Sequence, residues 1–158
     1  MEKRISTTTE AALIAAMYLV FTALSQEFGL ASGPIQFRIS EALAILPLLT
    51  YSAVPGLTMG CLLANAFTGC ALWDIIGGAA ATLIGAIGTY FFRKKPIIGI
   101  MCPILSNTLI IPFILTFVYG AEGTYPYFVL TVFLGEVVTV GLLGWILYKS
   151  IKKTKLFI

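Results

Sequence analysis

Six apolar segments occupy most of this chain, and they constrain its fold more than any other feature. Three of them approach or exceed the ~20 residues that a helix needs to cross a bilayer. Charged residues make up only 11% of the chain and the mean hydropathy is +0.99, whereas a soluble domain carries about 25% charged residues. We therefore predict an all-α membrane protein. The segments are approximately Ala11–Ser25, Ala42–Tyr51, Val54–Phe67, Trp73–Phe92, Ile97–Tyr119 and Tyr127–Tyr148.

The number of spans depends on residues 42–67, which Pro47, Ser52 and Pro55 interrupt. This stretch is either one long span or a hairpin of two short ones. All basic residues except Arg38 fall in three clusters, and the positive-inside rule places such clusters in the cytoplasm. Only six helices put an even number of spans between the clusters. The clusters are Lys3 and Arg4; Arg93, Lys94 and Lys95; and Lys149, Lys152, Lys153 and Lys155.

We therefore predict six transmembrane helices with both termini in the cytoplasm, folded as a single domain over residues 1–158. The first apolar stretch follows a basic N-terminus, but no small-residue cleavage site follows it. We expect it to be retained as the first helix and not removed as a signal peptide.

This topology gathers polar side chains toward the outer side of the membrane. Glu136 lies about nine residues into the last helix, on the order of 14 Å from its outer end. A carboxylate that faced lipid there would cost ~2.5 kcal/mol or more, so we expect it to face the bundle interior with a partner such as Asn107. The pattern indicates a pocket that opens to the outside. The candidate substrate-binding residues are Glu136, Asn107, Glu41, Asp74, Asn65, Arg38, Gln36 and Trp73.

Several of these residues have an alternative interpretation. Glu41 could cap the second helix together with Ser40, and Asp74 could cap the fourth. Arg38 could serve only to neutralise Glu41. Trp73 could be a residue of the aromatic belt at the membrane interface. The loop at residues 26–40 could close over the pocket as a lid.

Two patterns of small residues indicate close helix packing. The fourth segment has a small residue at every fourth position, which forms a ridge for a neighbouring helix. That ridge consists of Gly77, Ala81, Gly85 and Thr89. The first segment carries two overlapping A-x-x-x-A pairs, whose smooth face suits either a helix of a partner protein or a neighbour within the bundle. These alanines are Ala11, Ala12, Ala15 and Ala16.

The composition argues against catalysis by this chain. It has no histidine, and Cys61, Cys70 and Cys102 lack the paired spacing of zinc or redox sites. We interpret them as small apolar packing residues. No Walker A motif or other phosphate-binding glycine loop is present. The net charge of +3 comes from clusters at helix ends and does not indicate nucleic-acid binding. We therefore expect no cofactor in the chain.

Four stretches resemble the QueT family, whose members are substrate-binding S components of energy-coupling factor (ECF) transporters for queuosine precursors. The resemblance runs from the first helix to the last and is most specific in QFRISEAL at residues 36–43. The other stretches are GCLLANAFTGCALWD at residues 60–74, Asn107 with Pro112, and Gly135 with Glu136.

This resemblance implies a six-helix protein of the cell membrane that captures a micronutrient from outside and delivers it to the cytoplasm. Such S components associate with a transmembrane coupling subunit and two cytoplasmic ATPases, which bind ATP and Mg²⁺, and are thought to topple in the membrane to release their cargo. An alanine motif on the first helix is the usual docking face for the coupling subunit. The alanines at positions 11, 12, 15 and 16 fall where the family carries this motif.

The substrates implied by the resemblance are 7-deazaguanines such as preQ1, preQ0 or queuine. Their guanine-like edge offers two parallel N–H donors, which one carboxylate can accept in bidentate fashion. The O6 carbonyl needs an N–H donor, a cationic aminomethyl group needs a second carboxylate, and the flat base can stack on Trp73 or a phenylalanine. Which carboxylate takes which group is left open.

Two other functions compete with this one. An S component for another micronutrient would share the topology and the alanine face. An ion-coupled secondary transporter could use Glu136, although the sequence shows no inverted repeat of the kind found in such transporters. A membrane enzyme is the least favoured, because the chain has neither a histidine nor an activated nucleophile pattern.

Overall fold

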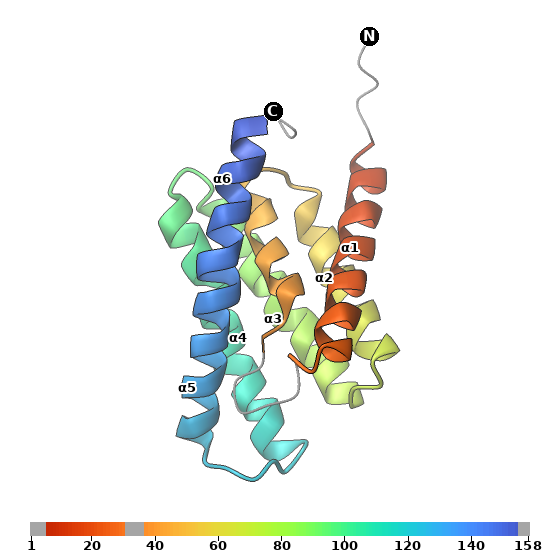
Figure 1. Ribbon diagram of the computed structural model, residues 1–158, viewed down its shortest axis with the longest axis vertical. Coiled ribbons are helices and arrows are strands. Elements are labelled where there is room, and N and C mark those ends of the chain that lie inside the picture. Colours follow the sequence, from red (N-terminus) through yellow and green to blue (C-terminus); the bar gives the residue numbers. More distant parts are fainter. Residues whose placement is uncertain (1–5, 31–36, 155–158) are drawn as a thin grey trace.

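The computed structural model describes residues 6–30 and 37–154 as an antiparallel bundle of helices (Figure 1). Within these residues there are six helices and no strands, as the sequence predicted. The last of the six, Tyr125–Thr154, is one continuous helix that consists of three consecutive elements. The elements are α1 (Thr7–Glu27), the 3₁₀ helix η1 (Ile39–Leu48), α2 (Ala53–Phe67), α3 (Leu72–Phe91), α4 (Pro96–Phe117), α5 (Tyr125–Glu136), the π-helical η2 (Val137–Gly144) and α6 (Trp145–Thr154).

The helices alternate in direction, so that both ends of the described chain lie at one end of the bundle. Figure 1 shows the start of α1, the turn between α3 and α4 and the end of α6 together at this end. The connection between α4 and α5 lies at the opposite end. We call the first the basic end, because it holds Arg93–Lys95 and the lysines of α6. Lys3, Arg4 and Lys155 lie outside the described residues.

Local signals begin and end several of these helices. The Ser6 hydroxyl caps α1 by accepting a hydrogen bond from the Thr9 backbone N–H at 3.2 Å, which satisfies one of the free donors at the helix start. Pro96 opens α4, where a residue without an N–H costs nothing. After α2, Gly69 adopts a left-handed φ of 73°, which is a conformation that glycine takes without steric penalty.

The second helix differs from its predicted form. It is a 3₁₀ helix over Ile39–Leu48 and not a helix over residues 42–51, and it is buried from Ser40 onward between α1, α3, α4 and η2. A 3₁₀ helix rises about 2.0 Å per residue, against 1.5 Å in an α-helix. Ten residues therefore cover about a third more distance, so this short segment reaches from the middle of the bundle toward the basic end (Figure 1).

Glycines allow two helix pairs to pack closely. A Cβ on Gly60 of α2 would come within 2.8 Å of the Tyr18 Cβ and 3.0 Å of the Ala15 Cα of α1. On α3, a Cβ at Gly85 would lie 2.7 Å from the Pro103 Cα of α4. The predicted small-residue ridge of α3 therefore packs against α4, and Gly60 belongs to a second such contact that the sequence analysis did not identify.

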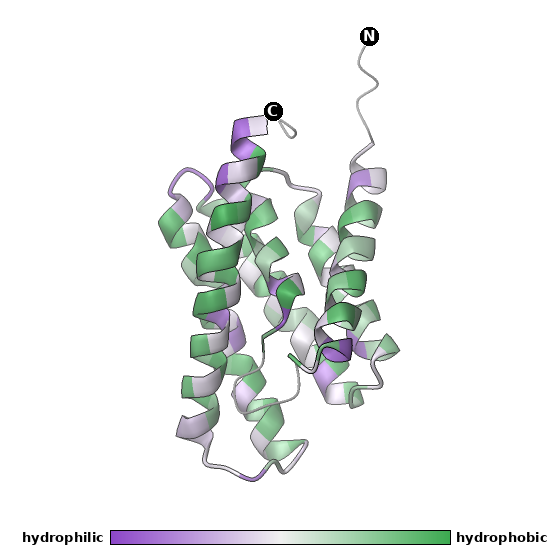
Figure 2. Cartoon of the chain, viewed as in Figure 1, coloured by the Kyte–Doolittle hydropathy of each residue, from purple (hydrophilic) through white to green (hydrophobic). Residues whose placement is uncertain are grey.

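The outside of the bundle is apolar along the length of its helices. Figure 2 shows hydrophobic residues over most of each helix and hydrophilic residues at the end of α6. Ile84, Leu109 and Phe117 are 57%, 66% and 68% exposed, and side chains of this kind are stable at such positions when lipid surrounds them. Among the described residues, four helices are long and apolar enough to cross a membrane, while η1 and α2 are shorter apolar helices. The chain is therefore a helical membrane protein.

Candidate functional site

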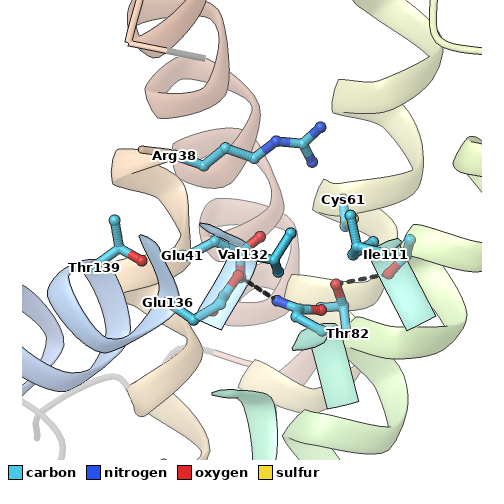
Figure 3. Close-up of a pocket in the computed structure, with 10 residues that line it drawn as sticks. Arg38, Glu41, Cys61, Thr82, Ile111, Val132, Glu136 and Thr139 are labelled. Carbon is cyan, nitrogen blue, oxygen red and sulfur yellow. Dashed lines mark hydrogen bonds between the residues drawn. The ribbon is translucent and has the colours of Figure 1, made fainter. Parts of the chain in front are cut away.

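A cavity that contains several polar side chains lies inside the bundle and takes its walls from η1, α2, α3, α4, α5 and η2 (Figure 3). Its volume is about 40 Å³. This volume lies below the range of small-molecule sites, about 300–1,000 Å³. The lining residues are Arg38, Glu41, Cys61, Gly78, Thr82, Asn107, Ile111, Val132, Glu136 and Thr139.

Two buried carboxylates face each other across Asn107. The Asn107 amide nitrogen donates to Glu136 Oε1 at 2.8 Å and makes a longer contact of 3.4 Å with Glu41 Oε2. All three side chains are at least nine-tenths buried. The predicted partnership of Glu136 with Asn107 is therefore present in the structure, and Glu41, far away in sequence, joins it from η1.

The second oxygen of Glu136 is an open acceptor. Glu136 Oε2 is buried and has no hydrogen-bond partner among the described residues. Almost all buried polar atoms in proteins have a partner, and a buried carboxylate oxygen without one is costly. Because Glu136 lines the cavity, a ligand that brings an N–H group there would supply the missing donor.

Glu41 is held from the other side by α1. The Tyr18 hydroxyl donates a hydrogen bond to Glu41 Oε1, and Tyr18 is fully buried. The side chain of Glu41 thus bonds to other side chains and not to the backbone of η1, and the N-cap residue of η1 is Arg38. The alternative in which Glu41 and Ser40 cap this helix is therefore wrong, because burial turned the carboxylate inward.

Arg38 forms the opposite, basic side of the cavity. Its guanidinium donates to Asn65 Oδ1 at 3.2 Å, and Figure 3 shows it extended away from Glu41 and Glu136, toward the Cys61 side. Asn65, fully buried on α2, donates in turn to the Asp74 backbone carbonyl at 3.3 Å. Arg38 therefore bonds to an amide and not to Glu41, which leaves the cavity with two acidic groups on one side and one basic group on another.

Asp74 lies outside this cavity and has a structural contact. Its Oδ2 accepts a hydrogen bond from the Tyr119 hydroxyl at 3.0 Å, and the same hydroxyl accepts one from the Ala71 N–H at 3.0 Å. Burial and the adjacent Asp74 carboxylate raise the pKa of Tyr119 to about 12, so Tyr119 stays protonated at neutral pH and remains a donor. Asp74 does not cap α3, because its carboxylate bonds to Tyr119 and the N-cap position of the helix is occupied by Ala71.

Two further candidates are not part of the cavity wall that the structure describes. Trp73 is 67% exposed in the first turn of α3, the position expected of a residue at the membrane interface. No aromatic ring is among the described lining residues, so stacking on Trp73 has no support from this geometry. Gln36 lies outside the described residues.

The sequence did not predict that Tyr18 belongs to the site, nor that Thr82, Thr139 and Cys61 line the cavity. Cys61 is buried, as a packing residue should be, but it also lines the cavity. One signal could have revealed Tyr18, because Tyr18, Thr22 and Ser25 stand four and three residues apart within the apolar segment Ala11–Ser25. Residues with this spacing share one helix face.

The alanines of α1 divide between two faces. Ala15 is buried, and its backbone lies against Gly60 of α2, while the Ala11 carbonyl oxygen would be 2.8 Å from a Cβ on Gly56. Ala12 and Ala16 are exposed. Ala11 and Ala15 therefore pack within the bundle, as one interpretation of the alanine pattern predicts. Ala12 and Ala16 remain accessible to a helix of another protein, as the other interpretation requires.

The family of this chain follows from comparison with known proteins. No solved structure matches the chain. The Queuosine precursor transporter QueT of Lactococcus lactis subsp. cremoris (strain MG1363) is 28% identical over 83 residues, which cover 52% of this chain and 49% of that protein. The matched region thus spans about half the length of this curated relative. The family model described as QueT transporter matches residues 8–153, and the chain therefore belongs to the QueT transporter family.

Proposed function

We propose that this chain is the substrate-capture subunit of an ECF-type importer for queuosine precursors. It binds a 7-deazaguanine from outside the cell and delivers it to the cytoplasm, while partner subunits hydrolyse ATP. Its family and the name of its Lactococcus relative support the substrate. The observation that carries the proposal is the buried group of Glu41, Asn107 and Glu136, with one acidic oxygen left open inside a cavity.

The cavity offers the types of group that a guanine-like edge requires. The N1–H and the 2-amino group of the ligand donate to the carboxylates, where Glu136 Oε2 has no hydrogen-bond partner within residues 6–30 and 37–154. The O6 carbonyl accepts from Arg38, whose guanidinium carries five N–H donors, more than its bond to Asn65 uses. A cationic aminomethyl substituent is stabilised by whichever carboxylate the edge does not occupy.

In the cell membrane the chain forms one domain with six spans and cytoplasmic termini. The basic end supports this orientation, because the turn Arg93–Lys95 and the lysines of α6 lie there together (Figure 1). The positive-inside rule then places this end in the cytoplasm. Four helices of the described residues are long and apolar enough to cross the membrane individually, and the stretch that contains the shorter η1 and α2 supplies the remaining pair of spans.

Labelling of single cysteines tests this topology. Lys94→Cys, in the exposed turn between α3 and α4, is expected to react with a membrane-impermeant maleimide only after the cells are opened. Glu122→Cys, in the exposed loop between α4 and α5, is the matched control and is expected to react in intact cells. The cysteines at 61, 70 and 102 are replaced by serine in both variants. Labelling of Lys94→Cys in intact cells would contradict the six-span orientation.

The partners in this proposal are a transmembrane coupling subunit and two cytoplasmic ATPases, which hold ATP and Mg²⁺ while this chain carries no cofactor. The exposed pair Ala12 and Ala16 supports a docking face on α1, because small residues let another helix approach closely in a bilayer. An ion-coupled transporter would work without such partners. Co-purification of the coupling subunit and the ATPases with the tagged chain is the result expected here.

Direct binding tests the substrate. The purified chain in detergent is titrated calorimetrically with 7-aminomethyl- and 7-cyano-7-deazaguanine and, as a control, with 7-deazaadenine, which lacks the N1–H and the 2-amino group. Saturable binding of at least one deazaguanine and none of 7-deazaadenine is the expected result, because a hydrogen-bonded site rejects a ligand that leaves its polar groups unpaired. Binding of an unrelated vitamin with no binding of deazaguanines would favour an S component for another micronutrient.

A further inference from the structure

Helix α1 holds the start of η1 through a row of polar contacts. Tyr18, Thr22 and Ser25 lie on one face of α1, and each bonds to a successive residue of η1. The Tyr18 hydroxyl donates to Glu41, the Thr22 and Ser40 hydroxyls are 2.8 Å apart, and Ser25 Oγ accepts from the Ile39 N–H at 2.9 Å. We call Tyr18, Thr22 and Ser25 the α1 polar row. It fixes the segment that presents Glu41 to the cavity.

Tyr18 itself is held firmly by its surroundings. Its side chain is fully buried in the core cluster with Ile14, Leu57 and Cys61. Its Cβ faces Gly60 of α2 so closely that even a methyl group on Gly60 would lie 2.8 Å away. Packing of this density leaves a side chain a single rotamer. The hydroxyl position is therefore set by the contact between α1 and α2.

This contact makes the two oxygens of Glu41 unequal. Oε1 accepts from Tyr18, on the α1 side of the carboxylate, whereas Oε2 has only the 3.4 Å contact with Asn107. Asn107 makes its shorter bond, 2.8 Å, to Glu136. Oε2 of Glu41 is thus the oxygen that can accept a further, shorter hydrogen bond from a ligand. It lies on the side of the carboxylate that faces Asn107.

We propose that Tyr18 is a positioning residue of the ligand site: by fixing Glu41 Oε1 it turns Oε2 to the ligand and so sets which ligand groups the site prefers. This inference rests on the proposed function, because it assigns Tyr18 a part in the same site. Tyr18 is not among the residues that line the cavity, so it acts only through Glu41. Fixing the acceptor in advance favours binding, because the Glu41 side chain then loses less conformational freedom when the ligand binds.

The test compares Tyr18→Phe with Tyr148→Phe, each of which removes only a hydroxyl. Tyr148 is a buried tyrosine of the other core cluster, packed on Trp145 near the basic end and absent from the cavity wall. Affinities are measured for three ligands: 7-deazaguanine and its 7-aminomethyl and 7-cyano derivatives. Glu41→Gln is measured beside them as a reference, and the melting temperature of each empty variant is recorded.

Tyr18→Phe is expected to weaken binding of the preferred ligand about tenfold, the effect of losing a hydrogen bond to a charged group. The loss of affinity should differ among the three ligands, and the ligands should rank in the same order of loss as they do with Glu41→Gln. Tyr148→Phe should change no affinity by more than about twofold. A uniform loss for all ligands, or none, would overturn the positioning role. If the unmodified chain binds none of the three ligands, the proposed function fails as well, so the two failures can be told apart.

Discussion

Glu136→Gln is expected to lower the affinity for a queuosine precursor by about 30- to 150-fold, which corresponds to ~2–3 kcal/mol. In the structure Glu136 Oε1 accepts from Asn107, and Oε2 is buried without a partner in the part of the chain that the structure describes. A glutamine keeps its carbonyl toward Asn107 and turns its NH₂ to the position of Oε2. Two donors then face each other when the ligand binds, and a charge-assisted hydrogen bond is lost.

The same substitution is expected not to lower the melting temperature of the empty protein. A buried carboxylate oxygen without a donor destabilises the fold, and the neutral amide removes that charge. Loss of binding together with unchanged or higher stability would be typical of a site kept for function at the expense of stability. Loss of binding together with loss of folding would instead indicate that Glu136 supports the bundle.

Asp74→Asn is the matched control for this experiment. It makes the same change from acid to amide at another buried residue, but Asp74 lies outside the cavity and its carbonyl can still accept from Tyr119. Its affinity should stay within about twofold of that of the unmodified chain, since no ligand contact changes. Isothermal titration gives both affinities. An equal affinity for Glu136→Gln and the unmodified chain would remove Glu136 from the site and leave Glu41 as the carboxylate to test.

Ala16→Trp is expected to abolish transport while ligand binding to the purified chain stays intact. Ala16 is exposed on α1, and an indole there would prevent the close approach of a partner helix. Uptake of labelled precursor is measured in cells that also produce the coupling subunit and the ATPases. Recovery of these subunits with the tagged variant is measured in parallel and is expected to fall to background.

Ala15→Trp is the comparison that makes this result specific. Ala15 is 8% exposed and its Cα lies against Gly60, so an indole has no room and should destabilise the bundle by 1–3 kcal/mol or more. We expect a lower melting temperature and reduced binding for Ala15→Trp, and neither for Ala16→Trp. Normal uptake by Ala16→Trp would show that the exposed alanine pair is not a docking face.

The sequence does not distinguish the buried Ala15 from the exposed Ala16. In a bilayer, the lipid-facing and the buried faces of a helix are both apolar, so periodicity does not reveal which face is inside. The sequence therefore identified the alanine pattern of α1 but not its division between Ala15 and Ala16. The polar Tyr18 on the same helix was overlooked for a related reason, because its partner Glu41 is 23 residues away.

The candidate site was predicted in part. Glu136 and Asn107 were identified because polar groups at membrane depth are costly unless they have partners. The cavity also contains Glu41 and Arg38, as expected, although Glu41 was also considered as a helix cap. Asp74 and Trp73 were placed with them on the basis of their common membrane side, but the structure puts Asp74 against Tyr119 and leaves Trp73 exposed.

The sequence by itself determined that this chain is a bundle of apolar helices, because lipid offers backbone groups no partners and forces each segment to satisfy its hydrogen bonds internally. That requirement acts within each segment, so the local sequence suffices. Only the tertiary structure decided that η1 is a 3₁₀ helix, that Tyr18 holds Glu41 and that Glu136 keeps one oxygen open. Those features depend on contacts between segments far apart in the chain, and such contacts follow from packing and burial.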